Sequence, residues 1–214
     1  MYPGRLLSVR VSSIELAILI KRVPAEFNSL ESGEFPPEQE IHLRAGERLT
    51  SPVFSRLYDD YFPRVYNYLS YRTTSREEAE DLTALVFERV ISQYRSFDPR
   101  RGSFETWLFS IARNAHYNQS RSKKRHPQQE LDETLEDSER NNPTDYILRQ
   151  EELARLRNYI TQLSERDREL LALRYGAGMS QKRMAEVLEM NENSVTVALG
   201  RALRRLRRLF EAEE

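Results

Sequence analysis

The sequence has no cysteine among its 214 residues. This excludes disulfide bonds, thiolate metal sites and cysteine nucleophiles together, and it fits a reducing cytoplasm. Long apolar runs are also missing: the best candidate, residues 14–20, falls far short of the roughly 20 residues of a membrane helix and is closed by Lys21 and Arg22. We therefore expect a soluble, cytoplasmic protein.

Signatures of catalysis are missing as well. The chain has no phosphate loop and no HExxH motif, and its three histidines are scattered: His42, His116 and His126. Four acids lie close together, namely Glu77, Glu78, Glu80 and Asp81. Three of them fall in the first turn of an expected helix, where acids favour the helix dipole, so they need no catalytic role. We expect no enzymatic activity, no metal and no cofactor.

Charge is balanced overall but segregated along the chain. The net charge is −1, yet residues 106–129 hold five Lys or Arg and no acid. Residues 130–140 then hold six acids, and residues 180–210 hold seven basic residues against three glutamates. This pattern predicts two basic surfaces separated by an acidic connector.

Helical periodicity and capping signals define a first domain. Apolar residues recur at helical spacing from Val53 onward, and Pro63 should kink or split that first helix. Ser75 with Glu78 forms a capping box for a helix to about Tyr94. Ser103 can cap a third helix, which reaches residue 125. We predict a domain over residues 53–125, preceded by a mostly irregular N-terminal extension over residues 1–52.

A second domain is expected over residues 145–211, after a polar, acidic, flexible linker over residues 126–144. Ser164 should cap a helix that ends near Gly176, and Ser180 a short helix to Leu188. A last helix runs from about Glu192 to Phe210. Nothing alternates as strands do, so the predicted fold class is all-α, with two small helical domains.

The last two helices have the order of a helix-turn-helix, whose second helix enters the major groove of DNA. Short polar residues begin that second helix, and its arginines arrive from Arg201 onward. Short side chains can contact base edges, and arginines a turn or two later can reach phosphates. An amphipathic helix with a solvated basic face is the competing interpretation.

Three segments in a fixed order are more specific than any one motif. They are EEAEDLTALVFERVISQY (residues 77–94), SFETWLFSIARNAHYNQSRSKKR (103–125) and LSERDRELLALRYGAGMSQKRMAEVL (163–188). Together they resemble the small sigma factors of the extracytoplasmic-function (ECF) group of the sigma-70 family, over about residues 53–210. The resemblance implies a promoter-specificity subunit of RNA polymerase. Sigma region 2 (residues 53–125) would dock on the polymerase and open the −10 element, and sigma region 4 (residues 145–211) would bind the −35 element.

The resemblance also implies three sets of site residues. Those that dock on core polymerase are Glu80, Asp81, Leu82, Thr83, Phe87 and Glu88. Those that capture the −10 strand are Arg100, Arg101, Arg113, Asn114, Tyr117, Arg121, Lys123 and Lys124. Those that contact the −35 element are Glu192, Asn193, Ser194, Thr196, Val197, Gly200, Arg201, Arg204 and Arg205. Trp107 lies on the apolar face of its helix, so we expect it in the core.

Partners follow from the same resemblance: core RNA polymerase through its β and β′ subunits, promoter DNA, and an anti-sigma factor. The free protein should be a monomer. Several residues depart from the family pattern. Thr196 and Ala198 stand where the family often has Arg or Lys, and Asn118 stands where it often has aspartate. Glu189 stands in the turn where glycine is common, and Gly200 stands where a larger residue is usual and weakens its helix. The alternative function is a one-component helix-turn-helix regulator, which would bind palindromes as a dimer and act without polymerase.

Overall fold

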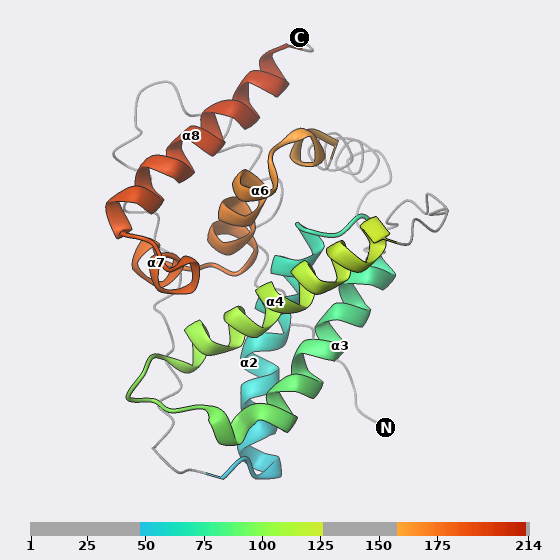
Figure 1. Cartoon of the computed structure of the whole chain (residues 1–214), viewed down its shortest axis with the longest axis vertical. Helices are drawn as coiled ribbons and strands as arrows, with labels where there is room; N and C mark the ends of the chain where they lie inside the picture. Colours follow the sequence, from blue (N-terminus) through green and yellow to red (C-terminus); the bar gives the residue numbers. More distant parts are fainter. Residues whose placement is uncertain (1–47, 126–157, 213–214) are drawn as a thin grey trace, which may run out of the picture.

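The computed structural model describes residues 48–125 and 158–212. Every regular element within these two ranges is helical, which confirms the all-α class. Helices α2, α3 and α4 form one group, and α6, α7 and α8 form a second group beside it (Figure 1). The expected linker and the first 47 residues lie outside the described residues, and the predicted domain boundaries remain predictions.

Helix α2 (Ser51–Ser70) is continuous through Pro63, so of the two expected effects, a kink or a split, the split is wrong. An interior proline removes one backbone hydrogen bond and costs about 3 kcal/mol or more. The same helix buries a full stripe of side chains on both sides of the proline: Leu57, Tyr61, Val65, Tyr68 and Leu69. Burial of each such side chain contributes about 1.5–3 kcal/mol, which outweighs the lost bond.

The two other helices of this group begin where their caps predict. The Ser75 hydroxyl accepts from the Glu78 amide at 3.2 Å and starts α3 (Arg76–Gln93), which leads into a short 3₁₀ turn, η2 (Tyr94–Ser96). The Ser103 hydroxyl accepts from the Thr106 amide at 3.1 Å and starts α4 (Phe104–Arg125). Each cap satisfies one of the backbone donors that a helix start leaves without a partner.

The second group is held by local signals of the same kind. Ser164 caps α6 (Glu165–Leu171) through the Asp167 amide at 3.2 Å. A π-helical turn, η3 (Ala172–Gly176), extends α6, and Gly178 then takes a positive φ of 68°. The Arg174 guanidinium donates to the Met179 carbonyl at 2.8 Å, which closes this buried turn.

The turn between the last two helices carries the strain expected at Glu189. Ser180 caps α7 (Gln181–Leu188), and Glu189 ends it with φ 54° and ψ 42°. A residue with a Cβ pays about 1–2 kcal/mol in this left-handed conformation. Asn191 then caps α8 (Glu192–Glu211), so α7 and α8 form the expected helix-turn-helix.

The two groups of helices pack against each other, which the sequence did not predict. Their buried side chains form one continuous apolar cluster, and α2 lies directly on η3. A Cβ on Gly176 would stand 3.0 Å from the Asn67 carbonyl oxygen and 3.0 Å from Tyr68 Cα. Only glycine allows so close an approach of one backbone to another. We call this compact form the closed arrangement.

Hydropathy gives a separate result: none of the helices in the described ranges is long and apolar enough to cross a membrane.

Candidate nucleic-acid and polymerase interfaces

The expected polymerase-docking face on α3 divides into exposed and buried members. Glu80, Asp81 and Glu88 are exposed, and Glu80 pairs with Arg76 at 2.7 Å. The other three expected residues, Leu82, Thr83 and Phe87, are all buried. The Thr83 hydroxyl donates to a backbone carbonyl of its own helix at 2.6 Å. The buried three support the helix from within, and the acids form the surface that a partner can touch.

The loop between α3 and α4 places an aromatic cluster beside two exposed arginines. Phe97, Phe104 and Trp107 lie with ring centroids 5.4–5.6 Å apart. Trp107 is half-buried against the core, as expected. Arg100 and Arg101 are exposed. Hydrogen bonds from Arg100 hold the pKa of the Asp98 carboxyl below its usual value.

Helix α4 presents the remaining residues expected to bind the −10 strand. Asn114, Tyr117, Arg121 and Lys123 are exposed, while Arg113 is half-buried. Lys123 pairs with Glu78 at 3.0 Å. The Lys124 side chain lies outside the described residues. A basic helix next to an aromatic cluster has the two components that single-strand binding needs, phosphate contacts and stacking platforms.

The start of α8 is open to solvent, as a recognition helix requires. Glu192, Asn193 and Ser194 are exposed, and Val197 keeps 51% of its surface. The Thr196 hydroxyl hydrogen-bonds to Gln181 at the start of α7, which ties the two helices of the motif together. Short polar and small apolar side chains of this kind can reach base edges and thymine methyl groups.

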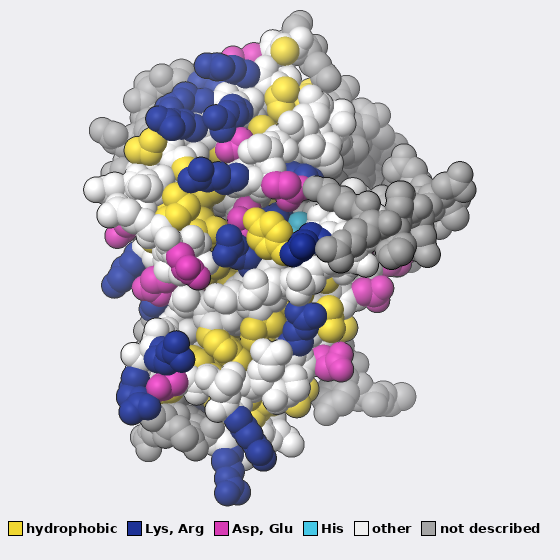
Figure 2. Space-filling model, viewed as in Figure 1, with side chains coloured by type: hydrophobic (Ala, Val, Ile, Leu, Met, Phe, Trp, Pro, Cys, Tyr) yellow, Lys and Arg dark blue, Asp and Glu magenta, His cyan; other side chains and the backbone are white. Residues whose placement is uncertain are grey.

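Two residues expected at the −35 element have contacts within the protein. Gly200 is buried in the packing of α8. The Arg205 guanidinium is directed to both oxygens of Asp167 at 2.8 Å, across the second helix group. Arg201 and Arg204 are exposed as expected. Figure 2 shows Lys and Arg side chains gathered over α8 on this face of the molecule.

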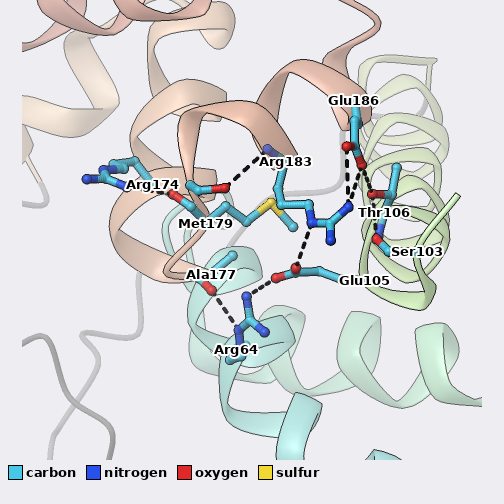
Figure 3. A network of polar contacts seen from close by, with 10 residues as sticks. Arg64, Ser103, Glu105, Thr106, Arg174, Ala177, Met179, Arg183 and Glu186 are labelled. Carbon is cyan, nitrogen blue, oxygen red and sulfur yellow. Dashed lines mark hydrogen bonds and ion pairs between the residues drawn. The ribbon is translucent and has the colours of Figure 1, made fainter. Parts of the chain in front are cut away.

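A first polar network joins the two helix groups around Glu105, which is 3% exposed (Figure 3). Arg64 on α2 bonds to Glu105 and donates to the Ala177 carbonyl at 2.8 Å. Arg183 on α7 lies 3.9 Å from the other Glu105 oxygen and 3.0 Å from Glu186. The Thr106 hydroxyl donates to Glu186 at 2.7 Å. Burial alone would raise the pKa of Glu186, but these bonds from Thr106 and Arg183 outweigh it and lower that pKa.

A second network joins the groups around Glu169 on α6. Arg113 donates to one Glu169 oxygen at 2.9 Å, and the Tyr117 hydroxyl donates to the other at 3.3 Å. Arg72, which follows α2, lies 3.4 Å from Glu169 and donates to Glu165 at 3.1 Å. Two residues expected to bind the −10 strand are therefore occupied by a carboxylate from the other group.

His116 contacts Arg72 of this second network through both of its ring nitrogens. One of its ring nitrogens lies 3.2 Å from the Arg72 guanidinium and the other 3.0 Å from the Arg72 carbonyl oxygen. Burial, with the charge of Arg72 adding to it, lowers the pKa of His116; Glu165 and Glu78 oppose this. The neutral ring fits both contacts, since one nitrogen accepts from the guanidinium while the other donates to the carbonyl.

The pairings in these two networks could not be predicted from the sequence. Arg72 and Glu165 lie 93 positions apart, and Arg64 and Glu105 lie 41 apart. Glu105 and Glu165 are acids in the first turns of α4 and α6, but that position does not indicate which arginine each one meets. Helical spacing describes one helix at a time, so it cannot pair charges on different helices.

Residues 57–126 match the family described as Sigma-70 region 2, and residues 153–206 match Sigma-70, region 4. The chain is similar to the ECF RNA polymerase sigma factor RpoE of Cereibacter sphaeroides, with 30% identity over 72% of this chain and 84% of that protein. It belongs to the ECF group of RNA polymerase sigma factors.

Two further matches agree. The ECF RNA polymerase sigma factor BldN of Streptomyces coelicolor is 32% identical over 78% of this chain, and the match spans 62% of BldN. The sigma factor RpoE in its complex with the anti-sigma factor NepR from Bartonella quintana has a TM-score of 0.60, with 20% identity over 75% of this chain and 98% of that one. This last likeness concerns the fold. Sigma factors are transcription initiation factors and not enzymes.

Proposed function

We propose that this sigma factor docks on core RNA polymerase through the exposed acids of α3, holds the −10 strand along α4 and reads the −35 element with the start of α8. The observation that carries the proposal is the exposure of two separate nucleic-acid surfaces of different character. One is a basic helix beside an aromatic cluster, suited to a melted strand. The other is a helix-turn-helix with short side chains, suited to a duplex.

Promoter binding requires the closed arrangement to open. The −10 and −35 elements lie about 25 base pairs apart, which is about 85 Å along B-form DNA. In the closed arrangement, α7 of the helix-turn-helix touches α4, and the Thr106 hydroxyl on α4 bonds to Glu186 on α7. We infer that the two helix groups separate when the protein binds both elements, because α4 and α7, while in contact, cannot reach two elements so far apart.

Run-off transcription with core polymerase on genomic fragments tests the function. We expect discrete start sites that appear only when the protein is added. The one-component alternative predicts the opposite: a dimer that binds palindromic DNA tightly without polymerase and adds no start sites. Size-exclusion chromatography of the free protein gives the oligomeric state in the same series.

The docking face is tested by charge reversal. Asp81→Lys should abolish co-elution with core polymerase, because it reverses a charge at the centre of the exposed acids. Glu77→Lys is the matched control, since Glu77 is an exposed acid of the same helix outside the docking set. Equal loss in both variants would count against a specific face, as would no loss in either.

We further propose that an anti-sigma factor binds this protein. The solved relatives RpoE and CnrH were captured with the anti-sigma factor NepR and with the cytosolic domain of CnrY. Pull-down with this chain as bait, followed by inhibition of run-off transcription by the captured protein, tests the proposal. A captured protein that leaves transcription unchanged would contradict it.

A further inference from the structure

The Glu169 site has the composition of an anion-binding cradle. Region 2 supplies Arg72 and Arg113, whose guanidinium carbons lie 5.8 Å and 5.4 Å from the centre of the Tyr117 ring. Region 4 supplies the anion, the Glu169 carboxylate, which is 4% exposed and takes contacts from all three side chains. Two guanidinium groups and a phenol around one oxyanion is also an arrangement that binds a phosphate.

The acids that neutralise the arginines of this cradle belong to region 4. Arg72 is fully buried, and both of its acidic partners, Glu165 and Glu169, lie on α6. Its Nε and Nη1 atoms make no hydrogen bond, and neither does the hydroxyl of fully buried Tyr68. Burial raises the pKa of Tyr68, so its hydroxyl stays protonated and can donate. The cradle therefore has donors that one carboxylate leaves unused.

Separation of the two groups removes both acids and leaves the two arginines side by side. A pair of like charges without a counter-ion recruits an anion. Arg113 and Tyr117 belong to the face of α4 expected to carry the −10 strand, so the anion at hand is a phosphate of that strand.

We infer that Arg72, Arg113, Tyr117 and Tyr68 form a phosphate-binding site for the backbone of the melted promoter strand, and that Glu169 occupies this site in place of the phosphate while the protein is closed. The inference rests on the proposed function and extends it. Arg72 becomes a DNA-binding residue, and Glu169 becomes an intramolecular competitor of DNA.

The test measures binding of a fluorescein-labelled 15-nucleotide oligodeoxythymidine to the full-length protein at low salt. Wild type should bind weakly. Glu169→Gln keeps the shape and loses the charge, so it should bind about tenfold tighter. Glu77→Gln is the matched control, because it makes the same change of net charge at an exposed site, and its affinity should stay within about twofold of wild type.

Non-additivity separates competition from a general charge effect. Arg113→Gln should change the affinity of wild type little, since Glu169 already occupies that arginine, but should remove most of the gain when combined with Glu169→Gln. Equal effects of Arg113→Gln in both backgrounds would overturn the inference. So would a Glu169→Gln protein that binds no tighter than wild type.

Two further measurements test whether the variant is folded and whether the site prefers phosphate over other anions. If Glu169→Gln melts at a lower temperature than wild type, Glu169→Arg serves as the second variant: it repels Arg72 and Arg113, so it should open the protein and expose the site. Inorganic phosphate, compared with chloride at equal ionic strength, tests whether the site takes any phosphate. A larger loss of oligonucleotide binding to Glu169→Gln in phosphate than in chloride would support a phosphate-binding site, and an equal loss in both salts would count against it.

Failure of the inference and failure of the proposed function give different results. A protein that starts transcription with core polymerase, but whose Glu169→Gln variant gains no affinity for the oligonucleotide, keeps its function and loses this competitor. A protein that starts no transcription loses the proposed function whatever the oligonucleotide shows.

Discussion

Replacing Gly176 by alanine should open the closed arrangement without changing any charge. The added Cβ would meet the Asn67 carbonyl oxygen, Tyr68 Cα and Tyr68 N, each at 3.0 Å. Carbon atoms in favourable contact stand about 3.5–4.0 Å apart. All three neighbours are backbone atoms, so no rotamer change relieves the clash, and η3 must move away from α2.

The magnitude follows from the cost of overpacking, which is typically about 1–3 kcal/mol. Because the clash exists only when the two helix groups touch, this cost falls on the closed form alone. It should shift the closed-to-open equilibrium by about 5- to 150-fold. Gly102→Ala is the matched control: no atom lies within 4 Å of its added Cβ, so the same substitution there should shift nothing.

Energy transfer between two dyes measures the opening. The chain has no cysteine, so Gln93→Cys and Gln162→Cys, both exposed and one in each helix group, can be labelled alone. Transfer efficiency should fall in Gly176→Ala and stay unchanged in Gly102→Ala. An unchanged efficiency in Gly176→Ala, together with a lower melting temperature, would show that the clash is absorbed inside region 4 and would refute the reasoning.

Three other predictions follow from single residues. Because the pKa of His116 is lowered, the unfolded chain binds more protons than the native state below about pH 6.5, so stability should fall on acidification by up to about 1.4 kcal/mol per pH unit. His116→Gln should flatten the melting temperature between pH 7.5 and 5.5 relative to wild type; equal slopes would assign the loss to other groups. Glu189→Gly should raise the melting temperature by about 2–4 °C, because glycine adopts the positive φ of 54° without the strain of about 1 kcal/mol that a Cβ causes. Glu189→Ala keeps that strain and should not raise the melting temperature. Val197→Asp should lower run-off transcription at least about tenfold with an unchanged melting temperature, since the side chain is half exposed at the start of the recognition helix; loss of stability instead would make it a packing residue.

The sequence predicted those parts of the fold that depend on local interactions. Ser75, Ser103, Ser164 and Ser180 each begin a helix at the expected position, because a cap needs only the amide three residues ahead. The strained turn was also foreseeable, since Glu189 stands where glycine is common in the family. Gly200 and Arg205 show the limit of this method. Their helical positions are compatible with DNA contact, but the sequence did not indicate that Gly200 is buried or that Arg205 pairs with Asp167.

The closed arrangement could not be read from the sequence for a physical reason. Its contacts join helices that are far apart in the chain. One of them involves Gly176, which the sequence pattern indicates only as a helix end and not as a contact with α2. A cation such as Arg72 is compatible with solvent, DNA or a carboxylate partner. Only the position of Glu169 in space decides among them.

The two proposed nucleic-acid surfaces are covered unequally in the closed arrangement. Arg113 and Tyr117 on α4 are engaged by Glu169, whereas Asn193 and Val197 at the start of α8 remain exposed. Affinity for a nucleic acid grows with each phosphate that a cation can neutralise, so engaged arginines weaken single-strand binding selectively. Under the proposed roles, the closed protein leaves the start of α8 accessible to duplex DNA while the single-strand face of α4 is blocked. Opening, by polymerase docking or by loss of Glu169, should raise affinity for a melted strand more than affinity for a duplex.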